Sequence, residues 1–286
     1  MNVPITILVP TRNEASNLGR CLKSVQWASE IYVVDSKSTD ATGQIAESFG
    51  ASVVQFEYNG GWPKKKNWAL THLPFRNEWV LLLDADEVLC EGGREEIQRV
   101  LKSKSEISGY WINRRFMFLG KWLKHAYYPN WNLRLFRHSL GRFERLVEGE
   151  TNSGDVEIHE HVFVKGATGR LKTELEHYAF PSVESFIEKH NRYSNWESRF
   201  EWELKKKGTP SLLQDRRVKL RRHLKLLSRK LPMRPLLRFW YIYFVQRGFL
   251  DGIEGYYFAQ LHACYEWMSV IKAFELNRNA SRRLGN

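Results

Sequence analysis

The chain has 286 residues, of which 43% are hydrophobic and 27% are charged. This composition supplies a packed core and excludes a chain that is disordered throughout. The formal net charge of +12 is concentrated in residues 205–238, which contain thirteen Lys or Arg residues and one acid, Asp215, while the rest of the chain has 31 residues of each sign. The distribution predicts a neutral globular domain with one basic segment, rather than a nucleic-acid-binding protein.

The cysteines and the apolar runs indicate the compartment. Cys21, Cys90 and Cys264 lie far apart without a CxxC pair, so we expect neither a zinc site nor a disulfide framework, and a reducing compartment fits best. No basic stretch followed by a long apolar one opens the sequence, so we expect no secretory signal. We also expect no membrane span, because the longest uncharged stretch of the aromatic C-terminal part, residues 255–265, is about half of the roughly 20 residues that a spanning helix needs.

The first ninety residues alternate between strand and helix patterns. Four short β-branched or apolar runs predict buried strands: residues 5–9, 31–34, 52–56 and 79–83. An amphipathic helix between the first two runs is predicted by apolar residues at helical spacing: Leu18, Cys21, Leu22 and Val25. A second helix is predicted over residues 41–49, after the capping residues 38–40 and before Gly50. Strand-helix-strand units at this spacing predict a parallel sheet.

The later part of the chain changes in character. Aromatic and arginine-rich runs separated by glycine-containing turns predict a mixed extension of the sheet: residues 110–116 and 133–137. A further strand is predicted over residues 171–176. A helical pattern follows Pro181 through Trp202. After the basic segment, which is interrupted at residues 208–210, Pro232 and Pro235, an aromatic helical tail is predicted to run to about Leu276.

These patterns divide the chain into a domain of residues 1–180 and a helical C-terminal extension of residues 181–286. Within the first domain, residues 1–90 carry the strand-helix alternation and residues 91–180 carry the later, mixed pattern.

Polar side chains follow three of the predicted strands, at the edge where parallel sheets bind ligands. The polar ends are residues 10–14, residues 35–38 and Asp84-Ala85-Asp86-Glu87. Asp84 and Asp86 offer oxygen ligands to a hard divalent cation, which can bridge diphosphate oxygens. A lone DxD tripeptide is also typical of a solvated turn, but the two other polar strand ends favour a site. Neither GxGxxG nor a P-loop follows the first strand, so we expect phosphates to be held in another way.

Four segments, in this order, resemble the signatures of family 2 glycosyltransferases with the GT-A fold: residues 9–14, 33–40, 66–70 and 83–87. Within that family the chain resembles the bacterial lipopolysaccharide core β-glucosyltransferase group, through His177-Tyr178, residues 189–194 and residues 248–252. The resemblance implies an α/β fold with a Rossmann-like mixed sheet, mostly parallel and flanked by helices, and a C-terminal helical extension. Within the first domain, it implies that residues 1–90 bind a nucleotide sugar and that residues 91–180 form the acceptor side.

The resemblance also implies an inverting glycosyltransferase. It would transfer a hexose, with glucose the first expectation, from a UDP-sugar to a lipopolysaccharide or lipooligosaccharide core or a similar membrane-linked saccharide. The expected chemistry is direct displacement assisted by a divalent cation, Mg²⁺ or Mn²⁺. Two alternatives stay open: a sugar-nucleotide nucleotidyltransferase, although its GxGxR loop is missing, and a non-catalytic basic membrane or nucleic-acid adaptor on the same fold.

By resemblance, donor binding is assigned to eight residues: Pro10, Thr11, Arg12, Glu14, Asp35, Lys66, Asp84 and Ala85. Asp35 would contact the base, Lys66 would face the diphosphate, and Asp84 would lie near the ribose or the metal. A carboxylate accepts hydrogen bonds from the base, and Lys66 offsets charge on the leaving diphosphate. The alternative for residues 64–66 is a solvated helix face.

Asp86 is the expected principal metal ligand, and His177, after the predicted strand 171–176, would complete the metal site. A structural histidine beside Tyr178 is the alternative. Arg134 and Arg137 are candidates for contact with an anionic acceptor or the diphosphate, or for stacking on aromatic rings.

Inverting transfer needs a carboxylate that accepts the proton of the acceptor hydroxyl. Residues 158–162 resemble the acidic acceptor-side position of the family, so Glu160 is the expected base, with three alternatives: Asp155, Glu157 and Glu148. In a strand, His159 and His161 point away from Glu160, and HExxH spacing is absent. We therefore assign these two histidines to packing or acceptor binding rather than to a metal.

The basic segment has the pattern of an amphipathic helix, with one stripe formed by Leu220, Leu224, Leu227 and Leu231. Basic helices of this kind are typical of membrane surfaces, and residues 239–244 add interfacial aromatics. The cations expected to contact anionic lipid are Arg216, Arg217, Lys219, Arg221, Arg222 and Lys225. A core-packing helix and nucleic-acid binding are the alternatives, the last without a supporting motif. We expect a peripheral location on the cytoplasmic face of the inner membrane, with donor, membrane-linked acceptor and lipid surface as partners and no nucleic acid.

Overall fold

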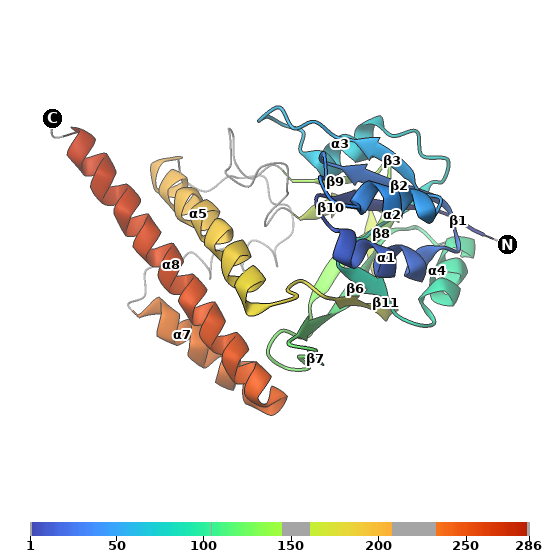
Figure 1. Ribbon diagram of the computed structural model, residues 1–286. Coiled ribbons are helices and arrows are strands. Elements are labelled where there is room, and N and C mark those ends of the chain that lie inside the picture. Colours follow the sequence, from blue (N-terminus) through green and yellow to red (C-terminus); the bar gives the residue numbers. More distant parts are fainter. Residues whose placement is uncertain (1, 104, 145–160, 208–232, 285–286) are drawn as a thin grey trace. The chain divides into compact units, whose positions relative to one another are not determined.

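The computed structural model describes residues 2–103, 105–144, 161–207 and 233–284 (Figure 1). They form two compact units. The first contains residues 2–124, 128–144 and 161–179, and the second contains residues 125–127, 180–207 and 233–284. The main chain enters the second unit briefly at residues 125–127, and it passes to the helices of that unit between Ala179 and Phe180.

A single mixed sheet forms the centre of the first unit. Its strands follow the order β3-β2-β1-β4-β8-β6-β11-β5, and β7 pairs with β6. The bounds are β1 Val3–Thr11, β2 Ala28–Asp35, β3 Ser52–Gln55, β4 Trp79–Leu82, β5 Glu87–Leu89, β6 Ile107–Phe118, β7 Lys121–Trp122, β8 Trp131–Arg137 and β11 Ala167–His177. A separate hairpin-like pair consists of β9 Gly141–Phe143 and β10 Val162–Val164.

The first four strands of this order, β3-β2-β1-β4, are parallel, as the strand-helix-strand pattern predicts. β8 joins them antiparallel to β4, and β6 runs antiparallel to β8 and parallel to β11. The predicted mixed α/β sheet, flanked by helices, is confirmed. Because β1 and β4 are neighbours, the polar segments after these two strands meet at one edge.

Helices cover both faces of the sheet (Figure 1). One face packs on α1 (Ala15–Val25), α2 (Thr42–Ser48) and α4 (Gly93–Lys102), and the other packs on α3 (Lys65–His72). The period-two alternation of β1 explains this, because Ile5 and Ile7 enter the first apolar cluster while Leu8 enters the second. The expected apolar stripe of α1 is fully buried, which stabilises the fold by roughly 1.5–3 kcal/mol for each large side chain.

The predicted second helix begins at Thr42, one residue later than expected. The cause is Asp40, whose carboxylate accepts hydrogen bonds from the backbone N–H of Thr42 at 3.0 Å and of Ala15 at 3.1 Å. Asp40 thus accepts a hydrogen bond from one backbone N–H group at the start of α1 and from one at the start of α2, where helical N–H groups lack partners within the helix. Gly50, with a φ of 70°, follows the helix in the left-handed region, as the sequence predicts.

The second unit is helical. It consists of α5 (Val183–Lys207), α7 (Arg234–Trp240), the π-helical turn η1 (Tyr241–Val245), the 3₁₀ turn η2 (Gly248–Asp251) and α8 (Ile253–Leu284). α8 packs on both α5 and α7. None of the helices in the described ranges combines the length and the apolar character that crossing a bilayer requires.

The prediction of one tail helix ending near Leu276 is wrong in two respects. The tail is broken at η2, and α8 continues to Leu284, because neither glycine nor proline occurs between Leu276 and Gly285. The break has a packing cause: a side chain at Gly255 would place Cβ 1.9 Å from the carbonyl oxygen of Gly248. Position 255 therefore requires glycine, and position 248 requires it for a separate reason, because a Cβ there would lie 2.8 Å from the Ile242 carbonyl oxygen.

Candidate active site

The loops after β1 and β2 are joined by side-chain hydrogen bonds. Asn13 has a left-handed φ of 53°, and its Oδ1 accepts the backbone N–H of Thr39 at 2.8 Å. Its own N–H is donated to Ser38 Oγ at 2.8 Å. Asparagine tolerates this backbone region better than most residues. The first two polar segments found in the sequence therefore form one structure.

Asp35, at the end of β2, is almost fully buried and accepts four hydrogen bonds from the protein. The donors are Thr11 Oγ1 at 3.0 Å, the backbone N–H of Ser38 at 2.8 Å, Gln55 Nε2 at 3.2 Å and the Ser38 hydroxyl. Burial alone would raise the pKa of Asp35, but the hydrogen bonds from Ser38, Thr11 and Gln55 outweigh it and lower the pKa. Asp35 is therefore a fixed carboxylate at neutral pH.

The other predicted donor residues lie around this carboxylate. Thr11 is buried, Pro10 and Glu14 are half-buried, and Arg12 is exposed. The Thr11 carbonyl oxygen accepts Lys65 Nζ at 2.6 Å. Lys64 and Lys65 are both buried, so the alternative of a solvated helix face does not apply to them. Lys65 instead fixes the end of β1 against the first turn of α3.

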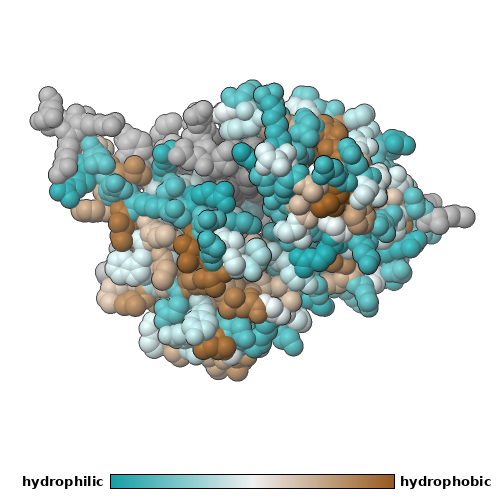
Figure 2. Space-filling model, viewed as in Figure 1, coloured by the Kyte–Doolittle hydropathy of each residue, from teal (hydrophilic) through white to brown (hydrophobic). Residues whose placement is uncertain are grey.

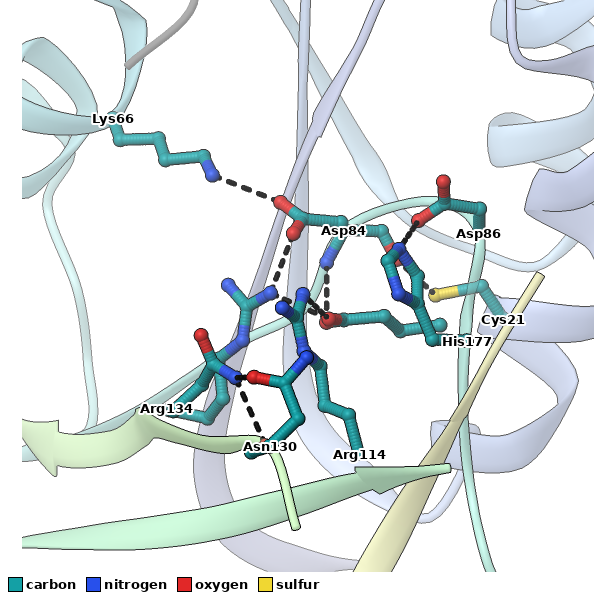
Figure 3. Close-up of polar contacts among 10 residues, drawn as sticks. Cys21, Lys66, Asp84, Asp86, Arg114, Asn130, Arg134 and His177 are labelled. Carbon is teal, nitrogen blue, oxygen red and sulfur yellow. Dashed lines mark hydrogen bonds and ion pairs between the residues drawn. The ribbon is translucent and has the colours of Figure 1, made fainter. Parts of the chain in front are cut away.

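Asp84 is the centre of a charged cluster at the end of β4 (Figure 3). Its Oδ1 lies 2.8 Å from Lys66 Nζ, and its Oδ2 lies 2.5 Å from an Arg134 guanidinium nitrogen. Burial would raise the pKa of Asp84, but the charges of Arg134 and Lys66 hold it well below its usual range. Arg134 is buried, and its neighbouring carboxylates raise its pKa above the ordinary value in spite of that burial.

Glu87, the first residue of β5, also belongs to this cluster. It is fully buried, and its Oε1 lies 2.5 Å from Arg134 and 3.1 Å from Arg114. Its Oε2 accepts the backbone N–H of Asp84 at 3.0 Å, which closes the turn (Figure 3). Glu87 had no predicted role, and Arg114 was not among the candidate residues. The position of Glu87, three residues after Asp84, is the signal that predicts such a return contact.

Asp86 and His177 face each other across the same turn, with Asp86 Oδ1 3.5 Å from His177 Nε2 (Figure 3). The antiparallel register explains the contact, because His177 at the end of β11 pairs with Glu87, the residue after Asp86. The backbone N–H of Tyr178 is donated to the Asp86 carbonyl oxygen at 2.8 Å. The Tyr178 hydroxyl is instead donated to Glu176, and the ring next to His177 is that of Phe116.

The donor set of this pair suits a divalent cation. Carboxylate oxygens are preferred by Mg²⁺ and Mn²⁺, and imidazole is the commonest nitrogen ligand of metals in proteins. Over the residues that the structure describes, no group of three or more His, Cys, Asp or Glu side chains is arranged to hold a metal ion. Cys21 does not join the pair: its buried thiol lies 3.7 Å from the Asp84 carbonyl oxygen, and burial together with the nearby carboxylates raises its pKa well above the usual value.

The first turn of α3 also connects the cluster to β9. The side-chain N–H of Asn67 donates a hydrogen bond to the Phe143 carbonyl oxygen, with an Nδ2–O distance of 3.0 Å. Asn67 Oδ1 accepts a hydrogen bond from the backbone N–H of Phe143 at 2.9 Å. Lys66 Nζ lies 5.4 Å from the centre of the Phe143 ring. Phe143 in turn pairs with Val162, the first residue of β10. Asn67 was not among the predicted site residues.

The remaining predicted residues are placed apart from the cluster or are not described. Arg137 lies at the opposite end of β4, where it pairs with Glu78 and stacks 4.8 Å from the Trp79 ring, so the stacking alternative describes it. His161 is exposed, and its N–H is donated to Glu144 at 3.1 Å. The others lie outside the described residues: Glu148, Asp155, Glu157, His159, Glu160, Arg216, Arg217, Lys219, Arg221, Arg222 and Lys225.

Residues 6–162 match the model of the family described as glycosyl transferase family 2. The chain belongs to glycosyltransferase family 2. It is 26% identical over 283 residues to the lipopolysaccharide core biosynthesis glycosyltransferase LpsC of Rhizobium meliloti (strain 1021), covering 96% of this chain and 93% of that one. An uncharacterized glycosyltransferase of Rickettsia conorii (strain ATCC VR-613 / Malish 7), RC0292, is 28% identical over 275 residues, with 95% and 90% covered.

Among solved structures, this glycosyltransferase is similar to the mannosyltransferase PcManGT from Pyrobaculum calidifontis in complex with GDP-Man and Mn²⁺. The TM-score is 0.50 at 15% identity, over 96% of this chain and 88% of that one. The likeness shows a shared GT-A fold. The resemblance found in the four sequence signatures is confirmed by the family match, and the predicted enzyme class, a glycosyltransferase, is confirmed with it.

Proposed function

We propose that this glycosyltransferase transfers a hexose from a UDP-sugar, with inversion, to a lipopolysaccharide core or a similar membrane-linked saccharide. The likeness to LpsC over almost the whole chain supports the acceptor class. The observation that carries the proposal is the convergence of Lys66, Asp84, Asp86 and His177 at the end of β4, where a parallel sheet binds its ligand (Figure 3).

Asp86 and His177 are the residues that would hold a divalent cation, Mg²⁺ or Mn²⁺. Their separation of 3.5 Å fits two ligands of one ion, since metal–oxygen and metal–nitrogen bonds are about 2.0–2.2 Å long. A bound cation would supply positive charge to the diphosphate as it leaves the sugar. PcManGT, which shares the fold, was solved with Mn²⁺ and GDP-Man.

The chain's own side chains would bind the base and the diphosphate of the donor. Asp35 presents a fixed carboxylate to the base, and Gln55, its most distant donor at 3.2 Å, is the protein partner that the base would displace. Lys66 holds its ammonium group 2.8 Å from Asp84 at the end of β4, where its positive charge would also act on the diphosphate. Arg134 holds Asp84 ionised, and Glu87 holds the backbone of Asp84 in place.

Glu160 remains the proposed base. Residues 158–162 resemble the acidic acceptor-side position of the family, and this resemblance supports the assignment. Glu160 itself lies outside the described residues. The basic residues 216–225 are proposed to contact anionic lipid at the cytoplasmic face of the inner membrane.

A donor panel tests the proposal. Purified protein is incubated with UDP-glucose and other nucleotide sugars, Mg²⁺ or Mn²⁺, and extracted lipooligosaccharide, and release of UDP is measured. We expect UDP release with at least one donor and its loss in Glu160→Gln, whose folding is checked by thermal melting. Formation of UTP and glucose 1-phosphate from UDP-glucose when pyrophosphate is added would indicate a nucleotidyltransferase instead. No thermal stabilisation by UDP with Mn²⁺ would indicate an adaptor without donor binding.

A further inference from the structure

Large apolar side chains are exposed together where the second unit turns from α7 into α8. We call this surface the aromatic face and define it by six residues: Trp240, Phe244, Val245, Phe249, Leu250 and Ile253. Their exposed fractions are 57%, 44%, 69%, 46%, 54% and 57%. Figure 2 shows hydrophobic side chains gathered over the helices of this unit. Isolated exposed apolar residues are common, but a contiguous group marks an interaction surface.

The polar groups of this stretch are turned toward the protein. Arg234 forms an ion pair with Glu266, and the buried Asp251 accepts the backbone N–H groups of His125 and Ala126 at 3.0 and 2.8 Å. Within residues 233–257, all of which the structure describes, Arg247 is the only charged residue in the exposed class. The folded unit thus leaves large apolar side chains exposed, while four of the five charged residues of this stretch are buried or half-buried.

The turn that carries Phe249 and Leu250 is rigid. Arg247 adopts a left-handed φ of 60°, and a Cβ at Gly248 would lie 2.8 Å from the Ile242 carbonyl oxygen. Gly255 closes against Gly248 in the same way, as described above. Two apolar side chains are therefore held at the tip of a turn that cannot fold them back into the unit.

We propose that the aromatic face enters the interfacial region of an anionic lipid bilayer. Trp, Tyr and Phe are the side chains that favour the headgroup level, since they combine a large apolar body with, in Trp and Tyr, a polar tip. With no spanning helix among the described residues, the unit would lie on the membrane rather than cross it. The inference rests on the proposed function for the source of the surface, the membrane that carries the acceptor.

Charge decides between a bilayer and a second copy of the chain as the occupant. Residues 205–232, which join directly to this stretch, contain eleven Lys or Arg residues and one acid. An anionic surface attracts this segment, whereas a second copy docked on the same face would bring two such segments together. Basic residues beside interfacial aromatics are the usual pair of signals for stable membrane binding.

Sedimentation with vesicles tests the inference. The vesicles contain phosphatidylethanolamine and phosphatidylglycerol at a 3:1 ratio, with no saccharide acceptor and no nucleotide. We expect full-length protein to bind, and Phe244→Ser/Val245→Ser to lower the partition coefficient on the order of tenfold. The matched control is Ile271→Ser/Phe274→Ser, at positions 58% and 66% exposed on α8. These lie roughly 30 Å along the helix from Ile253, and we expect them to leave binding unchanged.

Should the double variant fail to fold, Val245→Ser alone, at the most exposed position, gives the same test with a smaller effect. Unchanged binding of the variants at 244 and 245 would overturn the inference, as would an equal loss in the control variant. A concentration-dependent dimer in lipid-free buffer that these substitutions abolish would overturn it in favour of a second copy. Because the vesicles carry neither donor nor acceptor, a failed donor panel leaves this result untouched, and the reverse also holds.

Discussion

Asp86 Oδ1 lies 3.5 Å from His177 Nε2, and the register between β5 and β11 fixes this distance. His177 pairs with Glu87, so the residue before Glu87 must face the end of β11. The backbone hydrogen bond from Tyr178 to the Asp86 carbonyl oxygen, at 2.8 Å, closes the same corner. The two side chains therefore come together without help from a ligand, and a cation would enter a preformed pair.

Asp86→Asn and His177→Ala should each remove most of the metal-dependent binding of UDP. Each variant leaves one protein ligand of the pair, and loss of even an outer partner of a metal ligand typically costs 10–100-fold in affinity. We expect the Mn²⁺-dependent thermal stabilisation by UDP to weaken by about 100-fold in apparent affinity. His72→Ala, at an exposed histidine of the same unit, serves as the control. Retention of wild-type Mn²⁺ dependence in both variants would show that the metal ligands lie elsewhere.

Arg134→Met should destabilise the first unit strongly. It removes the guanidinium that lies 2.5 Å from both Asp84 and Glu87, and Glu87 is fully buried. Removing one partner from a buried charge pair costs about 3–5 kcal/mol. The loss should lie toward the lower end of this range, because Arg114 still lies 3.1 Å from Glu87 and Lys66 still lies 2.8 Å from Asp84. Urea unfolding should show a loss of this size in the free energy of unfolding. The double variant Arg134→Met/Glu87→Leu should recover part of it, and strict additivity would mean that the two residues do not interact energetically.

The sequence predicted the strands, α1 and the candidate residues after β1, β2 and β4 because these depend on local patterns. Runs buried on both faces mark parallel strands, and the residues that follow them fall at one edge. Asp84 and Asp86 were found for this reason. Glu87 and Arg114 received no role, since the partners of a charge inside a strand depend on register, and the β5–β11 and β6–β8 registers join segments far apart in the chain.

The break in the C-terminal helices was also beyond prediction from local patterns. The helical composition of the tail was correctly read, but the break at η2 depends on the contact between the backbones of Gly248 and Gly255. Periodicity cannot reveal a contact of this kind, because each glycine alone is compatible with a helix at modest cost. Arg137 differs from Arg134 for a comparable reason: three residues along β8 move the side chain to the other end of β4.

Two buried histidines should make the second unit sensitive to acid. Burial lowers the pKa of His190 to about 4, with a smaller contribution from Lys189, and burial also lowers the pKa of His262 well below its usual value. Both imidazoles are neutral in the folded state above a pH of about 4, whereas in the unfolded chain they bind protons below a pH of about 6.5. Stability is therefore complete above that pH and falls as the pH drops toward 4, by about 3 kcal/mol for His190.

Urea unfolding measured between pH 7.5 and 5 checks this sign. In that range, carboxyl groups with ordinary or lowered pKa values remain ionised in both states for the most part, so histidine protonation dominates the slope. His262→Phe should reduce the slope by about one proton. The ring of His262 lies among Phe186, Tyr127 and Phe258, where an apolar ring can be accommodated. A slope that stays the same in this variant would mean that His262 is not held neutral by the fold.

Lys66→Met should weaken donor binding while the fold is kept. Asp84 retains Arg134 as a partner at 2.5 Å, so its carboxylate stays compensated when the ammonium group is removed. A hydrogen bond between charged groups contributes about 1.5–3 kcal/mol, which corresponds to on the order of 10–100-fold in the Kd for UDP. Lys37→Met removes a lysine of the same unit whose ion pair with Glu57 is exposed, and it should leave UDP binding unchanged. Isothermal titration of UDP in the presence of Mn²⁺ measures both variants, and equal affinities would show that Lys66 serves only to compensate Asp84.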